Sequence, residues 1–324
     1  MNLSTQISEL ERFRRDPSVL KEFLNRRQLD GVELMQYEPW KEAAIPAGLV
    51  KGLHMSFWPF WLDFWKMDIP ELKRQFGGDW SYAEHYGGDS PEIMLETYRK
   101  DIATAVETGA EYLVFHVSHV RPRDCYTYDF AYGSKEVAEA SIELLNEVMD
   151  GVRADFRLLF ENLWWPGLTL IDREIAQMLL DKVRYPKKGF MLDTGHLMNN
   201  NRDLESEAQA VEYIMKTLHD LGELSSHIVG VHLNSSLSGS YVKSAIQAHR
   251  SDRTLWKNDF EGHAQLCRHV AEVDRHRPFI DAAVRKVIQY INPAYLVYEL
   301  RADSLEELEA DMILQDRALG LSPL

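Results

Sequence analysis

Six side chains that can bind a metal or move a proton follow apolar segments of the sequence. In KKGFMLDTGH (187–196), an apolar run over 189–192 leads directly into Asp193 and then into His196. A buried strand is destabilised by an uncompensated carboxylate, so we expect Asp193 to contact a cation or another compensating group. The alternative is a loop that faces water. The other residues at such segment ends are His54, His116, Glu161, His232 and Glu299.

Eight apolar segments, separated by helical patterns, would position these residues. They cover 1–7, 31–37, 50–57, 111–117, 157–163, 189–194, 228–234 and 294–300. Such alternation indicates a parallel sheet, either a closed barrel or an open doubly wound sheet. Side chains from six consecutive strand ends can meet only in the closed form, whose active sites lie at the carboxyl ends of the strands.

We therefore predict an α/β fold, a single (β/α)8 TIM barrel spanning residues 1–324. An aromatic-rich insertion (56–88) would follow the third strand, and a long insertion (235–275) would separate the seventh and eighth strands. Asp16-Pro17 and Ser90-Pro91 are typical helix starts. Gly109 is a typical helix end, and Ser304 with Glu307 indicates a capped last helix.

Composition restricts the class of protein. The chain has 324 residues and a formal net charge of −15, which argues against nucleic acid or anionic membrane as a partner. Its two cysteines, Cys125 and Cys267, cannot form a disulfide framework. No apolar stretch is long enough for a membrane span or a signal peptide, so we expect a cytoplasmic protein.

Glu161, Asp193, His232 and Glu299 form the most coherent candidate metal site. Three carboxylates and one imidazole suit a divalent cation such as Mn²⁺, Zn²⁺, Co²⁺ or Mg²⁺. Without a cation, at least one of the crowded carboxylates would have to take up a proton. Each residue alone is more typical of a cap or a salt bridge, and it is the barrel that would bring the four together.

The segments LLFENL, MLDTGH, VGVHLN and LVYEL resemble the xylose isomerase-like barrels. That family includes sugar isomerases, sugar epimerases and the endonuclease IV-type DNA repair enzymes. The resemblance implies that Glu161, Asp193, His232 and Glu299 are the shared metal ligands. It also implies that His196 faces the substrate.

Further segments resemble the DNA repair branch. VFHVSH and GLHMS place His116 and His54 where that branch has histidine ligands, and VDRHRPF resembles its D-R-H element, with Asp274 and His276 joining His196. Here a long segment separates this element from the seventh strand, unlike the family pattern. The alternatives are that the two histidines only hydrogen-bond at the barrel mouth, and that the D-R-H element lies in an exposed loop.

The chemistry we expect first is sugar or sugar-phosphate isomerisation or epimerisation. A metal would polarise a carbonyl and stabilise an enediolate, while Glu161 and Glu299 remove and return the proton and His196 binds a hydroxyl. The alternative is phosphoester hydrolysis with two or three metals, which requires all nine candidate ligands. A barrel that binds a small molecule without turnover is the third possibility.

Aromatic residues next to these positions would form a substrate pocket. They are Phe57 and Trp58 in the insertion after the third strand, and Trp164 and Trp165 after Glu161. The alternative is a hydrophobic plug over the barrel rim or a dimer contact. We expect a small carbohydrate-like substrate, and the resemblance adds homo-oligomers that pair through loops near the mouth.

Overall fold

The computed structural model describes residues 2–4, 15–35, 39–41, 43–77, 81–250 and 256–321. It shows a closed ring of eight parallel strands in chain order, in which β1 pairs with both β2 and β8. The predicted barrel is therefore confirmed, although parts of the predicted first and second strands (residues 1, 5–7, 36 and 37) lie outside the described residues. The strands are β1 (Asn2–Ser4), β2 (Gly31–Met35), β3 (Val50–His54), β4 (Tyr112–His116), β5 (Arg157–Glu161), β6 (Lys188–Asp193), β7 (Ile228–Leu233) and β8 (Tyr295–Tyr298).

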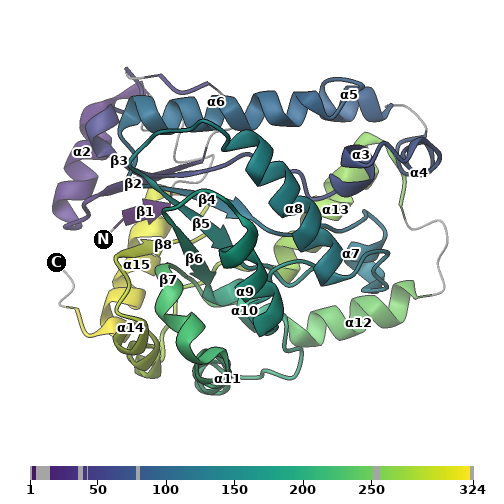
Figure 1. The fold of residues 1–324 in the computed structure, drawn as a ribbon. Helices are drawn as coiled ribbons and strands as arrows, with labels where there is room; N and C mark the ends of the chain where they lie inside the picture. Colours follow the sequence, from purple (N-terminus) through teal and green to yellow (C-terminus); the bar gives the residue numbers. More distant parts are fainter. Residues whose placement is uncertain are drawn as a thin grey trace.

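Helices surround the ring, as Figure 1 shows. Those of the outer layer are α2 (Pro17–Arg26), α6 (Glu92–Thr108), α8 (Ser134–Val148), α9 (Arg173–Lys182), α11 (Glu207–Leu221), α14 (Arg285–Ile291) and α15 (Leu305–Leu319). Three short 3₁₀ helices, η1 (Ala47–Leu49), η2 (Gly222–His227) and η3 (Ala282–Val284), precede β3, β7 and α14. None of the described helices combines the length and the apolar character needed to cross a membrane.

The helix ends follow from local sequence. The Asp16 side chain accepts a hydrogen bond from the Ser18 N–H at the start of α2, and Ser304 accepts one from the Glu307 N–H at the start of α15. Gly109 ends α6 with φ 69°, a left-handed conformation that costs glycine little. These caps satisfy backbone groups that each helix end leaves without an intrahelical partner.

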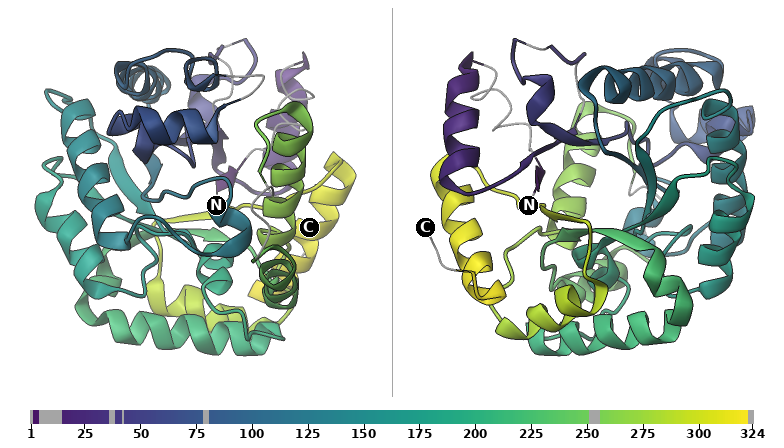
Figure 2. Two further views of the ribbon diagram at one scale, coloured as in Figure 1. Left: turned by 90° about the vertical axis from the view of Figure 1, so that its right-hand side faces the viewer. Right: turned by 60° about the vertical axis from the view of Figure 1, so that its left-hand side comes forward.

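The remaining helices belong to the segments that follow β3, β4, β6 and β7. They are α3 (Leu62–Trp65), α4 (Ile69–Gln75), α5 (Tyr82–Tyr86), α7 (Asp124–Thr127), α10 (Thr194–Asn199), α12 (Gly239–His249) and α13 (Phe260–Val273). Figure 1 shows α3, α4 and α13 on the right-hand side of the molecule, the end toward which the strands run, and the left view of Figure 2 looks onto that end. The segments after β3 and β7 touch there, because the Trp256 indole N–H donates to the Gln75 carbonyl at 2.9 Å.

The barrel interior is layered, since alternate residues of a strand point to the same face. A separate buried cluster contains Val114, Leu159, Met191 and Val297, each two residues before a candidate ligand on its own strand. In β3 and β7 the corresponding position is a glycine. A Cβ at Gly52 would lie 2.1 Å from the Tyr112 ring, so glycine there leaves room for that side chain. An apolar layer thus supports a polar layer at the carboxyl ends.

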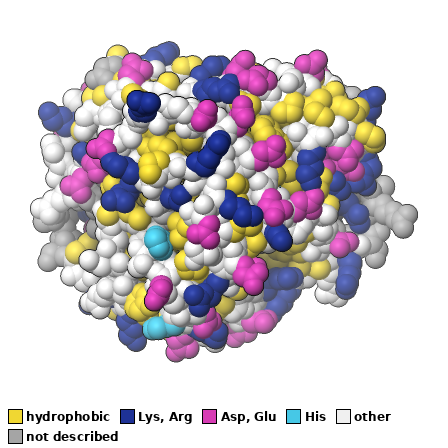
Figure 3. All heavy atoms as spheres, in the orientation of Figure 1, with side chains coloured by type: hydrophobic (Ala, Val, Ile, Leu, Met, Phe, Trp, Pro, Cys, Tyr) yellow, Lys and Arg dark blue, Asp and Glu magenta, His cyan; other side chains and the backbone are white. Residues whose placement is uncertain are grey.

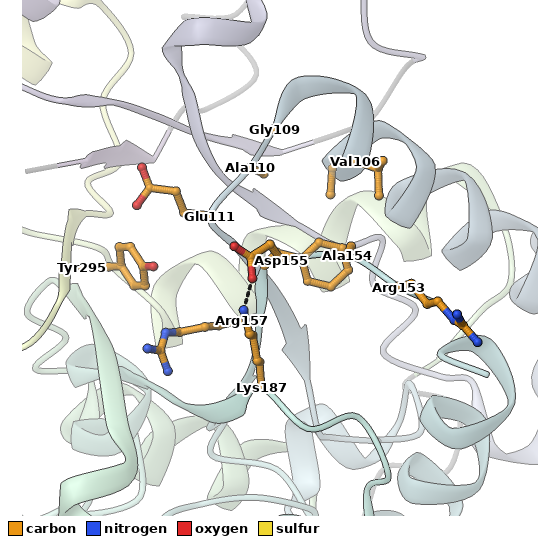
Figure 4. A pocket seen from close by; sticks show the side chains of 12 residues that line it. Val106, Gly109, Ala110, Glu111, Arg153, Ala154, Asp155, Arg157, Lys187 and Tyr295 are labelled. Atoms are coloured by element: carbon orange, nitrogen blue, oxygen red, sulfur yellow. Dashed lines mark hydrogen bonds and ion pairs between the residues drawn. The ribbon is translucent and has the colours of Figure 1, made fainter. Parts of the chain in front are cut away.

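Charged side chains of both signs are interspersed on the face in Figure 3. One hollow of about 580 Å³ is lined by Glu111, Arg157, Lys187 and Tyr295, which stand at the amino ends of β4, β5, β6 and β8. Figure 4 shows Lys187 paired with Asp155 at its edge. This hollow lies at the opposite end of the barrel from the candidate ligands, where TIM barrels do not place their active sites.

Candidate metal centre

The structure brings together the four predicted ligands at the carboxyl ends of β5 to β8. Glu161, Asp193, His232 and Glu299 each offer one ligand atom, and these atoms lie within 4.8 Å of one another. His232 Nδ1 is 3.2 Å from Glu161 Oε1, 3.0 Å from Glu299 Oε2 and 4.0 Å from Asp193 Oδ2. Such a set of hard oxygens with one nitrogen can hold a divalent cation.

A second group shares Glu161 with the first. The other carboxylate oxygen of Glu161, Oε2, lies 3.1 Å from His54 Nε2 and 3.0 Å from His116 Nε2, and these two nitrogens are 3.3 Å apart. The His54 Nδ1–H donates to the Met55 carbonyl at 3.0 Å, which orients Nε2 toward the centre. Glu161 therefore stands between two groups, with one oxygen in each.

The third group contains His196, Asp274 and His276. Asp274 Oδ2 lies 3.2 Å from His196 Nε2 and 2.6 Å from His276 Nε2. The outer nitrogens of both rings contact backbone carbonyls, of Asn162 at 2.9 Å and of Glu299 at 3.0 Å. His276 adopts φ 45°, a conformation that is costly for a residue with a side chain and is often found at functional sites.

The fold explains how the distant D-R-H element reaches this position. The α12–α13 segment leaves β7 and returns to it, because Ser235 and Arg277 pair through two backbone hydrogen bonds of 2.7 and 3.0 Å. The Ser236 hydroxyl also donates to the Val273 carbonyl at 2.7 Å. The long insertion thus closes on itself and places Asp274 beside the end of β7. The alternative of an exposed loop for this element is wrong.

Burial and crowding give these groups unusual proton affinities in the metal-free protein. Burial, together with the charges of Glu299 and Glu161, raises the pKa of Asp193 to about 8. Burial alone would lower the pKa of His54, but contact with Glu161 raises it to about 9. Despite burial, the surrounding histidines hold the pKa of Glu161 well below its usual range. Metal binding here would have to displace protons, so it should depend on pH.

One further observation indicates that the residues of the third group fit a metal. Asp274 Oδ1 is buried and has no hydrogen-bond partner among the residues the structure describes. A buried carboxylate oxygen without a partner carries a substantial desolvation cost. A cation at the third group would remove that cost. Imidazole and carboxylate donors together are compatible with zinc or manganese.

Three buried residues that support the centre are not predicted by the sequence patterns. The His232 Nε2–H donates to Glu33 Oε2 at 3.0 Å. Asn162 bonds to both the N–H and the carbonyl of Asp193, at 2.9 and 3.0 Å. The Asn234 Nδ2–H donates to Asp193 Oδ2 at 2.8 Å. A carboxylate in the otherwise apolar strand GVELM was the signal that could have identified Glu33.

Asp193 has a second role as the N-cap of α10. Its Oδ1 accepts a hydrogen bond of 2.6 Å from the His196 N–H. One carboxylate thus fixes the start of the helix that carries His196 while its other oxygen faces His232. This geometry explains the spacing of three residues in D-T-G-H, because an N-cap side chain reaches the N–H two or three positions later.

The aromatic residues predicted to form a pocket divide into two sets. The Phe57 ring packs edge-on against His116, with centroids 4.4 Å apart, and Trp164 lies 5.2 Å from His196. Trp165 packs against Trp164 at 4.6 Å.

Trp58 differs from the other three, because its ring contacts Tyr98 of α6 at 5.5 Å. Its described ring contact is therefore with the helical layer, away from the three ligand groups. A substrate contact for any of the four aromatic residues stays a prediction.

Comparison with known proteins identifies the family of the chain. The family described as "Xylose isomerase-like TIM barrel" matches residues 85–307. The chain belongs to this family. No curated protein matches the chain. The solved structures described next share only their fold with this chain, because their sequence identities to it are low.

Three solved structures illustrate the range of that fold. A D-tagatose 3-epimerase-like protein has a TM-score of 0.53 at 13% identity, covering 98% of this chain and 96% of its own. Endonuclease IV from Thermus thermophilus has 0.52 at 16%, covering 99% and 98%. The IOLI protein with a bound zinc atom has 0.50 at 14%, covering 99% and 98%. An epimerase-like protein and an endonuclease are thus both among these neighbours.

Proposed function

We propose that this xylose isomerase-like protein is a multi-metal enzyme that hydrolyses a phosphoester of a small, carbohydrate-like molecule. The observation that carries the proposal is the position of Glu161 between two ligand groups, with a different oxygen facing each. A carboxylate in that position can bridge two cations. All nine candidate ligands that this reaction requires fall into the three groups.

Bound divalent cations would supply Lewis acidity, which activates water and neutralises the charge of a phosphate group. The chain's own residues orient the centre. Glu33 fixes the His232 ring, and the carbonyls of Met55 and Asn162 fix His54 and His196. Preorganised donors and acceptors of this kind lower the barrier because they need no rearrangement during the reaction.

The residues around the mouth of the barrel favour a small substrate rather than duplex nucleic acid. The segments after β3 and β7 meet above the ring, where the Trp256 indole donates to the Gln75 carbonyl. The Phe57 ring packs edge-on against His116. The net charge of −15 is also unfavourable for a polyanion. These features support a small ligand that reaches the metal groups beneath the segments after β3 and β7.

Isomerisation or epimerisation of a sugar is the second candidate. It is supported by the group of Glu161, Asp193, His232 and Glu299, in which the two glutamates approach the same nitrogen of His232. In that reaction Glu161 and Glu299 would exchange a proton with the substrate and His196 would bind a hydroxyl. That reaction leaves His54, His116, Asp274 and His276 without a role, whereas hydrolysis uses all three groups.

The test compares metal content with activity. Purified protein is reconstituted with zinc or manganese and analysed by mass spectrometry, and hydrolysis of bis(p-nitrophenyl) phosphate and of small sugar phosphates is measured. We expect two or three metals per chain and metal-dependent hydrolysis. Asp274→Asn should lose one metal and most of the activity, whereas Asp203→Asn, at an exposed pair with Lys243, should change neither.

Three results would contradict the proposal. One metal per chain, with solvent deuterium entering a ketose in D₂O, would support the epimerase. Three metals with cleavage of a duplex that contains an abasic site would support a DNA substrate. A protein that binds these sugars without exchange or hydrolysis would be the non-catalytic barrel.

A further inference from the structure

A wall of unpartnered hydrogen-bond donors lies beside the third ligand group. Trp164 and Trp165 follow β5, and their side chains are 6% and 4% exposed. Neither indole N–H has a partner with full hydrogen-bond geometry among the described residues. A buried N–H that donates to nothing costs free energy. The Trp165 indole N–H, and the Trp164 indole N–H with only a weak contact to Tyr128, are therefore available to an acceptor on a ligand.

The Tyr128 hydroxyl extends this wall. It is also buried without a fully formed hydrogen bond among the described residues, although the Trp164 indole makes a weak contact with it. Tyr128 follows α7 in the left-handed region, with φ 55°. That conformation is unfavourable for tyrosine and tends to persist where function requires it.

A cation contacts the tyrosine ring. The Arg202 guanidinium carbon is 5.0 Å from the centre of the Tyr128 ring. Gly239 lies close against the Arg202 backbone, because a Cβ there would lie 2.1 Å from the Arg202 carbonyl oxygen. The neighbouring Ser238 hydroxyl donates to Asn199 Oδ1 at 2.9 Å, while the Asn199 Nδ2 group is buried without a partner among the described residues.

These groups share one chemistry. Indole N–H, amide N–H, hydroxyl and guanidinium all donate hydrogen bonds, and the guanidinium adds positive charge. The wall begins at Trp164, whose ring is 5.2 Å from His196 of the third ligand group. A ligand group that contacts these side chains would find a hydrogen-bond donor on each of them.

We infer that Trp164, Trp165, Tyr128, Asn199 and Arg202 form a subsite for a second anionic group of the substrate, a carboxylate or a phosphate, remote from the group held at the metals. The inference rests on the proposed function for the first group and names the substrate class more closely. The substrate would be a small molecule with an anion at each end.

The experiment measures binding by titration calorimetry on zinc-reconstituted protein and needs no turnover. The probes are methylphosphonate, with one anionic group, and two compounds with two, 3-phosphonopropionate and propane-1,3-bisphosphonate. The wild-type protein should bind at least one of the two-headed probes at least tenfold more tightly than methylphosphonate. The one that gains more identifies the second anion as carboxylate or phosphate.

Variants of the wall should remove the gain selectively. Arg202→Gln and Tyr128→Phe should each reduce the advantage of the two-headed probe to threefold or less and leave methylphosphonate affinity within twofold of wild type. Arg250→Gln, at an exposed position at the end of α12, is the matched control and should keep the advantage.

Equal affinities for all three probes in the wild type would overturn the inference. So would an advantage that survives Arg202→Gln, Tyr128→Phe and Trp164→Phe. If the protein hydrolyses no phosphoester but the two-headed probe still binds more tightly through these residues, the proposed function fails while the subsite stands.

Discussion

Glu33 offers the sharpest test of how the barrel orients its candidate ligands. Its side chain is fully buried, and Oε2 accepts the 3.0 Å hydrogen bond from His232 Nε2. A carboxylate behind a metal-binding histidine fixes the ring and makes it more basic, and its loss typically weakens metal binding about 10–100-fold. That range corresponds to about 1.4–2.7 kcal/mol.

We expect Glu33→Gln to fall near the tenfold end, because an amide oxygen can still accept from Nε2 but carries no charge. Glu33→Ala should fall near the hundredfold end, since it removes the acceptor as well. The assay is a competition titration against a chromogenic chelator, with the fold monitored by circular dichroism. Glu207→Gln is the control, because that carboxylate also accepts two N–H groups, but from Ile280 and Asp281.

The reasoning would be refuted by a well-folded Glu33→Ala protein that binds every metal as tightly as wild type. It would also be refuted if Glu207→Gln weakened binding equally, since the effect would then reflect general stability.

Three other predictions follow from the described contacts. Gly195→Ala places a Cβ 1.9 Å from Asn234 Oδ1, so thermal denaturation should show a loss of about 1–3 kcal/mol together with weaker metal binding; unchanged values of both would contradict the geometry. Chelation of the metals should lower the melting temperature by an amount that grows with free metal in the reference sample, and a melting temperature independent of metal would exclude a bound cation. Burial lowers the pKa of His119 to about 3, so the stability gained by keeping its ring neutral is complete above about pH 6.5 and is lost as the pH falls toward 3. Between pH 7 and 5, urea unfolding should therefore show a fall about 2 kcal/mol larger for wild type than for His119→Gln, whereas equal falls would be inconsistent with a buried neutral ring.

The barrel could be predicted from the sequence because polar side chains follow six consecutive predicted strands, and such side chains can meet only if the sheet closes. Each inward ligand stands two positions after an apolar or glycine residue of the same strand, and alternation along a strand is a local property. Glu161, Asp193 and His232 were therefore accessible from sequence. Their convergence required only the inference of a closed ring.

Other parts of the centre depend on contacts that no local pattern encodes. Glu33 shares no motif with His232, and only the packing of β2 into the ring brings them together. The position of Asp274 depends on the pairing of Ser235 with Arg277 across a long insertion. Trp58 was predicted with Phe57, yet Phe57 contacts His116 whereas Trp58 contacts Tyr98.

The pairing of the last strand with the first has a consequence for biosynthesis. Glu299 follows β8, which bonds to β7 on one side and to β1, near the start of the chain, on the other. A ribosome must therefore release the chain through Glu299 before the ligand set is complete. A cation that meets the nascent chain earlier finds only a partial set, so cation binding should follow the release of β8, and the affinity of the closed barrel decides which ion is kept.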